Sequence, residues 1–336
     1  MTDVAILSST ARVRRRRVPT ALVSPTGFVI IAGLNAFLLW AILLSGGLVR
    51  LTSSGLGCPD WPLCHGGVLP PTTEHPVIEF TNRMLSGVIV VYAVVAWLLT
   101  LATPTASGKV RGFMLAAAIM TVGQIPLGGI TVLSGLNPLM VGSHFLLALL
   151  GLGAAVMALV FYRDARRGWT RTWDRRRGPF ASLAALSLLA VVVTGILVTA
   201  SGPHSGAASA TDRLGNLQLT IWLHVRAVAT LAVFMVVLGL WIWRERPKDP
   251  LALPVLAVFL PLLAVQIFIG EYQFRHGLPW QWVAAHVPIA GLVWSCGLIL
   301  AWLAAAPPDR VTRGARVPAA ATETAAADSA APAPTA

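Results

Sequence analysis

The sequence is poor in charge. Only 11% of its 336 residues are Asp, Glu, Lys or Arg, whereas a soluble domain usually carries about a quarter. The deficit is gathered in long runs, which excludes an ordinary soluble protein. Residues 214–243 contain a single charge, Arg226. The stretches without any charged residue are 27–49, 84–108, 112–162, 178–211, 250–270 and 276–308.

The uncharged runs have the lengths of membrane-spanning helices. A helix needs roughly 20 apolar residues to cross about 30 Å of hydrocarbon. The longest run, 112–162, is too long for one span, and the sequence at 134–138 (Ser-Gly-Leu-Asn-Pro) is a strong turn signal. We therefore expect an all-α membrane protein with eight transmembrane helices. The expected helices are 27–49, 77–102, 112–133, 139–162, 180–200, 217–243, 251–270 and 281–304.

The positive charges lie mainly in alternate connections between these helices. If the N-terminus is in the cytoplasm, 20 of the 25 Lys and Arg fall on the inner side, as the positive-inside rule requires. The net charge of +12 therefore indicates topology in the cell membrane and not nucleic-acid binding, and both termini are expected in the cytoplasm. The inner set is Arg12, Arg14–Arg17, Lys109, Arg111, the seven arginines from Arg163 to Arg177, Arg244, Arg246, Lys248, Arg310, Arg313 and Arg316.

The segments outside the expected helices lack the length to bury a core of their own. Residues 1–26 are basic and resemble the first part of a signal peptide, but a full-length span follows without a clear small-residue cleavage site. We expect these residues to stay attached as a cytoplasmic N-terminus. Residues 163–179 are expected to form a basic cytoplasmic linker. Residues 305–336, rich in Ala, Pro and Thr, are expected to form a disordered cytoplasmic tail.

Polar and small residues inside the spans recur at a fixed distance along the chain. Five matches at one offset favour an internal duplication over coincidence. Each half then contains four spans, so both halves share one orientation, as in a parallel repeat about the membrane normal. We expect two pseudo-symmetric four-helix bundles at 27–162 and 180–304. The matches at an offset of 142 are Gln124/Gln266, Ile125/Ile267, Gly128/Gly270, His144/His286 and Asn82/His224, and Gly46, Leu48 and Val49 match Gly195, Leu197 and Val198 at 149.

Three of the seven histidines lie inside expected spans, namely His144, His224 and His286. The first and last lie about 9 Å along helices that enter from the outer face. An ionisable residue inside a membrane is costly and indicates a functional site by default. A lone histidine would be explained more simply by a hydrogen bond between helices, but three at matched depth favour a ligand role. Two imidazoles facing each other across a four-helix bundle can ligate a haem iron, whereas no cluster of residues has the spacing of zinc ligands.

The longest outer loop, residues 50–76, contains Cys58 and Cys64 six residues apart. Because this side of the membrane is oxidising, we expect the pair to form a disulfide. Such a disulfide is either a structural staple or a redox-active pair. The third cysteine, Cys296, lies inside the last span and is expected to be a small buried apolar residue.

The loop leads into a helix that carries Glu79, Asn82 and Arg83 near its outer end. Glu79 either forms an ion pair with Arg83 one turn away, or its carboxylate lies beside a bound substrate. In the second case it would accept a proton or stabilise positive charge at a carbon being oxidised. Arg50 and Arg83 are the outer arginines best placed to contact haem propionates, or they anchor helix ends.

These motifs together resemble the haem A synthase family, the membrane enzymes that make the cofactor of aa3-type cytochrome oxidases. The resemblance covers roughly residues 27–304. It rests on the segments 46–59, 61–66, 79–83 and 128–132 and on the three histidines inside spans. It implies an oxidoreductase that oxidises the C8 methyl of haem O to a formyl group.

The resemblance also implies roles for single residues. A haem b cofactor would lie between His224 and His286 in the C-terminal half, and the substrate haem O would bind His144 in the N-terminal half. Glu79 matches the glutamate implicated in catalysis, and the two loop cysteines match a disulfide tied to activity. Many members have His where this chain has Asn82, so the substrate haem is expected either to be five-coordinate or to hold a water that Asn82 binds.

Two alternatives to the enzyme stay open, a non-enzymatic b-type cytochrome that carries electrons and a haem transporter or chaperone. An electron carrier would be expected to keep a histidine pair in each bundle, and Asn82 argues against that. The expected partners are haem O, with haem O synthase as its donor, an electron acceptor of unknown identity, a thiol-disulfide oxidoreductase, membrane lipid and a second copy of the chain.

Overall fold

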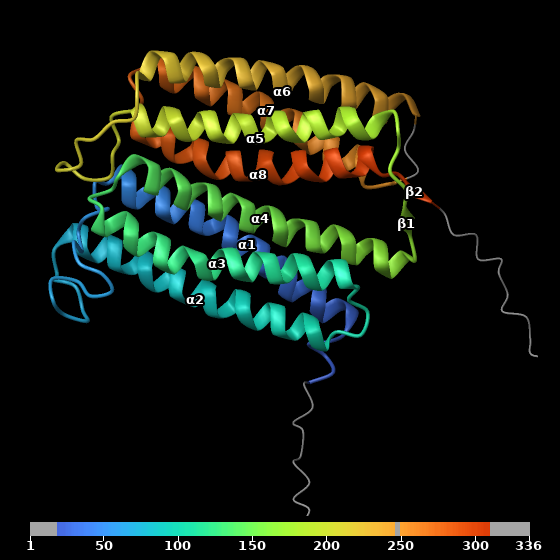
Figure 1. Cartoon of the computed structure of the whole chain (residues 1–336), viewed down its shortest axis with the longest axis horizontal. Helices are drawn as coiled ribbons and strands as arrows, with labels where there is room; N and C mark the ends of the chain where they lie inside the picture. The colour runs from blue at the N-terminus through green and yellow to red at the C-terminus, as the bar shows by residue number, and fades with distance from the viewer. Residues whose placement is uncertain (1–18, 246–248, 310–336) are drawn as a thin grey trace, which may run out of the picture.

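The computed structural model describes residues 19–245 and 249–309, and these residues form eight long helices and two very short strands (Figure 1). All eight helices are long and apolar enough to cross a membrane, so the prediction of an all-α membrane protein with eight spans is confirmed. The helices are α1 (Pro25–Leu51), α2 (Glu74–Ala102), α3 (Gly108–Leu133), α4 (Pro138–Arg167), α5 (Arg177–Ser201), α6 (Leu217–Glu245), α7 (Ala252–Arg275) and α8 (Trp280–Ala305), and the strands are β1 (Thr170–Arg171) and β2 (Pro308–Asp309).

Several helices are longer than the uncharged runs that predict them, because their terminal turns carry charged residues. α4 continues about one turn further than predicted, to Arg167, where Gly168 ends it with a left-handed φ of 63°. α3 begins about one turn earlier, at Gly108, and the Ser107 hydroxyl caps it by accepting a hydrogen bond from the Val110 amide. Basic side chains in such turns can extend beyond the hydrocarbon, so the uncharged length underestimates the helix.

The helices form two groups. In Figure 1, α1 to α4 lie together in the lower part of the view and α5 to α8 in the upper part. Consecutive helices pack against each other within each group, α1 also packs against α4, and α5 packs against α8. Contacts of α8 with α1 and α4, and of α4 with α5, join the groups. This arrangement is compatible with halves at 27–162 and 180–304, while their symmetry stays a prediction.

Tryptophans on facing helices fasten the two groups together. Trp40 of α1 donates its Nε1–H to the Pro288 carbonyl of α8 at 2.8 Å, and Trp294 of α8 donates to the Leu149 carbonyl of α4 at 2.8 Å. A Cβ added at Gly291 of α8 would lie 2.9 Å from a side chain of α1, so this glycine permits a close approach. Close packing and hydrogen bonds between helices carry the association in lipid, because lipid already solvates apolar side chains.

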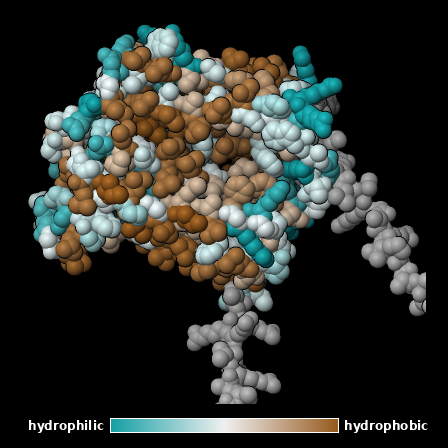
Figure 2. All heavy atoms as spheres, in the orientation of Figure 1, coloured by the Kyte–Doolittle hydropathy of each residue, from teal (hydrophilic) through white to brown (hydrophobic). Residues whose placement is uncertain are grey.

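The surface has the polarity of a membrane protein. Figure 2 shows hydrophobic residues across the middle of the visible face and hydrophilic residues gathered at its two ends. One end, which we call the loop end, carries the connections 52–73 and 202–216 (Figure 1). The opposite end, which we call the sheet end, carries β1 and β2 and both ends of the described chain. The loop end is therefore the one that the sequence predicts to be outer.

The structure corrects one expectation about the connecting segments. A disordered tail was predicted from residue 305, but β2 pairs antiparallel with β1 of the linker. Arg171 of the linker donates to the Ala306 carbonyl at 2.7 Å, and the Asp174 amide donates to the Ala305 carbonyl at 2.9 Å. Composition cannot reveal this pairing, because the partners are far apart in the sequence. Outside the described residues lie 1–18 and 310–336 of the predicted termini, with the predicted inner cations Arg12, Arg14–Arg17, Arg246, Lys248, Arg310, Arg313 and Arg316.

Candidate functional site

In the C-terminal half, α6 carries His224 and α8 carries His286. The His224 Nδ1 atom makes a 3.0 Å hydrogen bond with the Thr194 hydroxyl of α5, and the His286 backbone carbonyl accepts from Gln266 Nε2 of α7 at 3.1 Å. Hydrogen bonds therefore join α5 to the histidine of α6 and α7 to the histidine of α8.

Glycines on neighbouring helices make room for these imidazoles. A Cβ added at Gly195 of α5 would lie 3.1 Å from the Cε1 atom of His224, and one added at Gly270 of α7 would lie 3.5 Å from the Cε1 atom of His286. Each ring therefore packs directly on a helix backbone. A Cβ at Gly195 would force the His224 ring to shift slightly, whereas one at Gly270 would make an ordinary van der Waals contact with the His286 ring.

His144 of α4 has the same neighbours in the N-terminal half. Its backbone carbonyl accepts from Gln124 Nε2 of α3 at 3.3 Å, and a Cβ at Gly128 would lie 3.3 Å from its Cε1 atom. These contacts correspond to those of Gln266 and Gly270 with His286 in the other half. The sequence matches at an offset of 142 thus coincide with matching contacts.

Asn82 of α2 occupies the place that corresponds to His224. Its Oδ1 atom accepts a 2.8 Å hydrogen bond from the Ser45 hydroxyl of α1, as Thr194 binds His224. The glycines beside them differ, since Gly195 faces the His224 ring whereas a Cβ at Gly46 would meet nothing within 4 Å. The shorter Asn82 side chain therefore leaves open space beside α1.

The donor atoms of both halves suit a haem iron. The Nδ1 atoms of His144 and His286 are buried and have no hydrogen bond within the described chain. Thr194 engages only the Nδ1 side of His224, so the opposite ring nitrogen is available. Each imidazole thus retains a nitrogen for a metal, and histidine nitrogen is a usual axial ligand of haem iron. The residues fit a two-histidine site in the C-terminal half and a one-histidine site in the N-terminal half.

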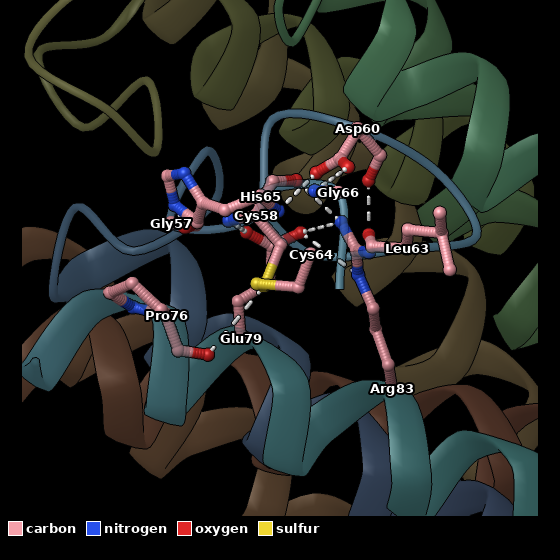
Figure 3. The surroundings of a disulfide bond; sticks show 10 residues. All are labelled: Gly57, Cys58, Asp60, Leu63, Cys64, His65, Gly66, Pro76, Glu79 and Arg83. Carbon is pink, nitrogen blue, oxygen red and sulfur yellow. Dashed lines mark hydrogen bonds and ion pairs between the residues drawn. A yellow bond between two sulfur atoms is a disulfide. The ribbon is translucent and has the colours of Figure 1, made fainter. Parts of the chain in front are cut away.

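The loop between α1 and α2 contains the disulfide that the sequence predicts, between Cys58 and Cys64 (Figure 3). The Asp60 carboxylate closes the turn by accepting 2.7 Å hydrogen bonds from the amides of Gly66 and His65. These two bonds lower the pKa of the Asp60 carboxyl, with the Gly66 amide the larger cause. The loop is therefore held by a covalent bond and by a carboxylate that is ionised at neutral pH.

Arg83 of α2 donates hydrogen bonds to several carbonyls of this loop (Figure 3). Its Nη1 atom donates to the carbonyls of Asp60 and Leu63 at 3.1 and 3.0 Å. Its Nη2 atom donates to the Cys58 carbonyl at 2.7 Å, and Nη2 and Nε both donate to Glu79. A guanidinium has five N–H groups, and all five have partners in the loop or in α2.

Glu79 is buried, with 4% of its surface exposed. Its Oε1 atom pairs with Arg83 at 2.5 Å, so the ion pair that the spacing predicts is present. Its Oε2 atom accepts from the Cys58 amide at 2.7 Å. The carboxylate is therefore fixed between the helix and the disulfide, with both oxygens engaged.

The same loop reaches the N-terminal histidine site through Trp61. The Trp61 ring lies against α3 at Gly129, where an added Cβ would be 2.8 Å from it. Gly129 adjoins Gly128, which faces His144. The loop with the disulfide, Arg83 and Trp61 thus lies next to the site that has Asn82 in place of a second histidine.

The remaining predicted residues are Arg50 and Cys296, and their surroundings differ. Arg50, at the end of α1, donates to the Thr199 carbonyl of α5 at 2.8 Å and so joins the two groups of helices. A propionate contact stays a prediction for Arg50 and for Arg83, and Arg83 would have to exchange one of its five hydrogen bonds to make it. Cys296 is half-buried, less enclosed than expected.

Sequence reasoning missed the two hydroxyl residues of the sites. Ser45 and Thr194 each bind the polar residue of the next helix, Asn82 and His224. They are separated by 149 residues, the same offset as the neighbouring glycine match. Extending that match by one residue, and allowing Ser to replace Thr, would have found them.

Comparison with known proteins identifies a family and several relatives. A family described as "Cytochrome oxidase assembly protein" matches residues 29–77 and 73–298. A protein named Heme A synthase from Bacillus pumilus is 29% identical over 147 residues, which is 42% of this chain and 47% of that protein. One from Shewanella oneidensis is 29% identical over 169 residues, or 45% and 49% of the two chains. One from Lysinibacillus sphaericus is 34% identical over 134 residues, or 37% and 42%.

The chain thus spans about half the length of the curated relatives that it matches. The family match is broader, because it extends from α1 to α8. It includes the disulfide loop, Glu79 and all three histidines of the spans. The sites described above therefore belong to the region that defines the family, and this chain is a member of the cytochrome oxidase assembly protein family.

Proposed function

We propose that this protein is a haem A synthase, an oxidoreductase that converts the C8 methyl of haem O to the formyl group of haem A for aa3-type oxidases. The observation that carries the proposal is the inequality of the halves. One half has a histidine on α6 and another on α8, as a permanent cofactor site needs. The other has one histidine, an open position beside Asn82, and the disulfide loop with Glu79 over it, as a substrate site needs.

In this proposal the substrate haem O binds the N-terminal half with its iron on His144. Asn82, held by Ser45, either leaves the opposite side of the iron open or binds a water there. Trp61 and the loop shield this end of the bundle from water. Arg50 is the better placed of the two candidate partners for a propionate, because the Arg83 donors are engaged.

Glu79 acts in this proposal as a fixed negative charge beside the methyl group being oxidised. Positive charge develops at the reacting carbon, and a preorganised carboxylate stabilises it without having to move. The alternative role, a proton acceptor, is less well supported, because both carboxylate oxygens already accept hydrogen bonds. Arg83 and the Cys58 amide hold the carboxylate in position.

His224 and His286 would hold a haem b cofactor in the C-terminal half. When bound, this group supplies one-electron redox chemistry. The chain's own contribution is to fix the imidazoles through Thr194 and the glycines, and to exclude water by packing four helices around the site. The electron acceptor has no assigned residue.

We place the protein in the cell membrane with both termini in the cytoplasm, which puts the disulfide loop on the oxidising side. Haem O synthase is the proposed donor of the substrate, and a thiol-disulfide oxidoreductase is the proposed partner of the cysteine pair. The asymmetry of Lys and Arg supports this orientation.

Pigment analysis of the purified protein tests the proposal. The full chain is expressed in cells that supply haem O, and extracted haems are identified by mass. Haem A, or a hydroxylated form of haem O, together with haem b is the expected result. Haem b alone would favour the electron carrier, and unmodified haem O alone would favour the transporter or chaperone.

A Glu79 variant tests the role of the carboxylate. Glu79→Gln keeps the shape and one acceptor, and Glu79→Ala removes the group. Both should lower haem A formation at least 100-fold, the scale on which one preorganised electrostatic group acts, while haem b content stays unchanged. Full activity in Glu79→Gln would refute the electrostatic role.

A further inference from the structure

α6 carries an exposed cation inside its membrane span. Arg226 lies nine residues after Leu217, the start of α6, which is about 13 Å along the helix. Within the described chain its guanidinium has no carboxylate partner, and its contact is the Trp222 ring, 3.6 Å from the Cζ atom. A charge in this position is costly unless something outside the chain compensates it.

The direction of the side chain shows where that compensation must come from. Helical side chains tilt toward the start of their helix, and α6 starts at the loop end (Figure 1). Trp222 lies one turn nearer to that end and is half exposed. Trp is enriched where membrane and water meet, so Arg226 extends past an interfacial ring toward the headgroups of the leaflet at the loop end.

An open groove of about 270 Å³ lies between α5 and α6 beside this cation. It begins at the residue after Arg226 and continues for about two turns toward the sheet end. Its two hydroxyls, of Ser187 and Thr230, donate to carbonyls of their own helices at 2.8 and 2.9 Å, so its chemistry is apolar. The other lining residues are Leu183, Leu186, Ala190, Ala227 and Phe234.

We propose that Arg226 and the α5–α6 groove form a binding site for one anionic phospholipid of the leaflet at the loop end. The phosphate pairs with the guanidinium, and an acyl chain lies in the groove. Charge complementarity favours an anionic lipid over one whose headgroup also carries an ammonium. A second copy of this chain would have to place a carboxylate on Arg226 instead, and a changed oligomeric mass would reveal that. This proposal does not depend on the haem chemistry.

Native mass spectrometry of the full chain in detergent tests the site. The protein is titrated with dioleoylphosphatidylglycerol, which is anionic, or with dioleoylphosphatidylcholine, which has no net charge. We expect the first phosphatidylglycerol to bind about fivefold more weakly to Arg226→Gln, the usual contribution of one arginine near a lipid surface. Arg226→Lys should retain most of the binding. Arg275→Gln removes a similarly exposed but paired cation and should have no effect.

A second pair of variants tests the groove while Arg226 is kept. Ala190→Phe fills the groove and should weaken phosphatidylglycerol binding by a similar factor. Ala264→Phe adds the same ring to an exposed position of α7 and should not. Unchanged thermal unfolding shows that each variant is folded. Equal binding of both lipids, or full phosphatidylglycerol binding by Arg226→Gln, overturns the proposal, as does a changed oligomeric mass without a change in lipid binding.

Discussion

At the scale of single residues, Asn82 sets the two histidine sites apart. His224 fills the space beside Gly195 and binds Thr194, whereas Asn82 binds Ser45 and leaves the space beside Gly46 empty. The difference is one ring, and it decides how many imidazole nitrogens each half offers to the proposed haems.

We predict that Asn82→His adds a second imidazole to the N-terminal site. The new ring has room beside Gly46 and can bind Ser45 as His224 binds Thr194. The substrate haem should then change from high-spin to low-spin, which its optical and electron paramagnetic resonance spectra report. Asn82→Gln, which lengthens the amide without adding an imidazole, is the control. An unchanged spectrum in Asn82→His would mean that this position does not face the iron.

A second prediction at this scale concerns Arg83 and the stability of the protein. Arg83→Gln removes the cation that pairs with buried Glu79, and leaving one partner of a buried pair uncompensated costs about 3 kcal/mol or more. The free energy of unfolding in detergent should fall by that amount. Arg83→Lys should restore only part of it, because a lysine offers three donors without the planar fork. Equal stability of all three proteins would show that the loop does not depend on Arg83.

At the scale of elements, the loop 52–73 joins a disulfide to the candidate catalytic carboxylate of Glu79. The disulfide holds Cys58 so that its amide donates to Glu79. The same loop also binds the other half, since the Gly55 amide donates to the Gly206 carbonyl at 2.8 Å. The loop therefore links the cysteine pair, the N-terminal site and the connection 202–216 at the loop end.

Replacing both loop cysteines by serine should destabilise the loop by about 2 kcal/mol, as expected for opening a short cross-linked loop. Limited proteolysis should then cleave the loop at a lower protease concentration. Haem A formation should slow, because the Cys58 amide no longer holds Glu79, while haem b stays bound between His224 and His286. The matched control is Cys296→Ser in α8. Multiple turnovers by the double variant at the normal rate would exclude a redox-active pair.

At the scale of the whole molecule, buried ion pairs at the sheet end tie the two halves together. Asp249, which precedes α7 and is 2% exposed, pairs with Arg163 of α4 and Arg171 of β1, each at 2.5 Å. Asp164 of α4 also pairs with Arg171 at 2.5 Å. One cluster therefore connects α4, the linker and the start of α7.

We predict that Asp249 makes part of the stability dependent on acid pH. Burial alone would raise the pKa of its carboxyl, but hydrogen bonds from Arg171, the Leu251 amide and Arg163 lower it below the ordinary 3.8. A pKa that folding lowers contributes stability that is full above 3.8 and is lost as the pH falls through the folded value.

Asp249→Asn tests this directly. The variant should lose about 3 kcal/mol at neutral pH, because buried Arg171 and partly buried Arg163 lose a shared partner. Its unfolding free energy should also vary less between pH 5 and pH 3 than that of the unchanged protein. An identical pH dependence of the two proteins would assign the acid sensitivity to other carboxyls.

The lengths of the uncharged runs and the turn signals between them predict much of the fold. The turn at Ser134–Pro138 and the basic segments predict all eight helices, because the membrane imposes a narrow range of span lengths. The repeat also predicts which residues share a site, as the contacts of His144 and His286 illustrate. The pairing of β1 with β2 was not predicted, because it depends on hydrogen bonds between segments far apart in the chain.

The sequence by itself determined the spans, their number and the identity of the polar residues inside them, since these depend on hydropathy and local spacing. Tertiary structure alone decided what those residues touch. It gave every N–H group of Arg83 a hydrogen-bond acceptor, brought the Cys58 amide to the Glu79 carboxylate and left space beside Asn82. These outcomes depend on how a loop folds back over helices and how closely helices approach, and no local pattern encodes either.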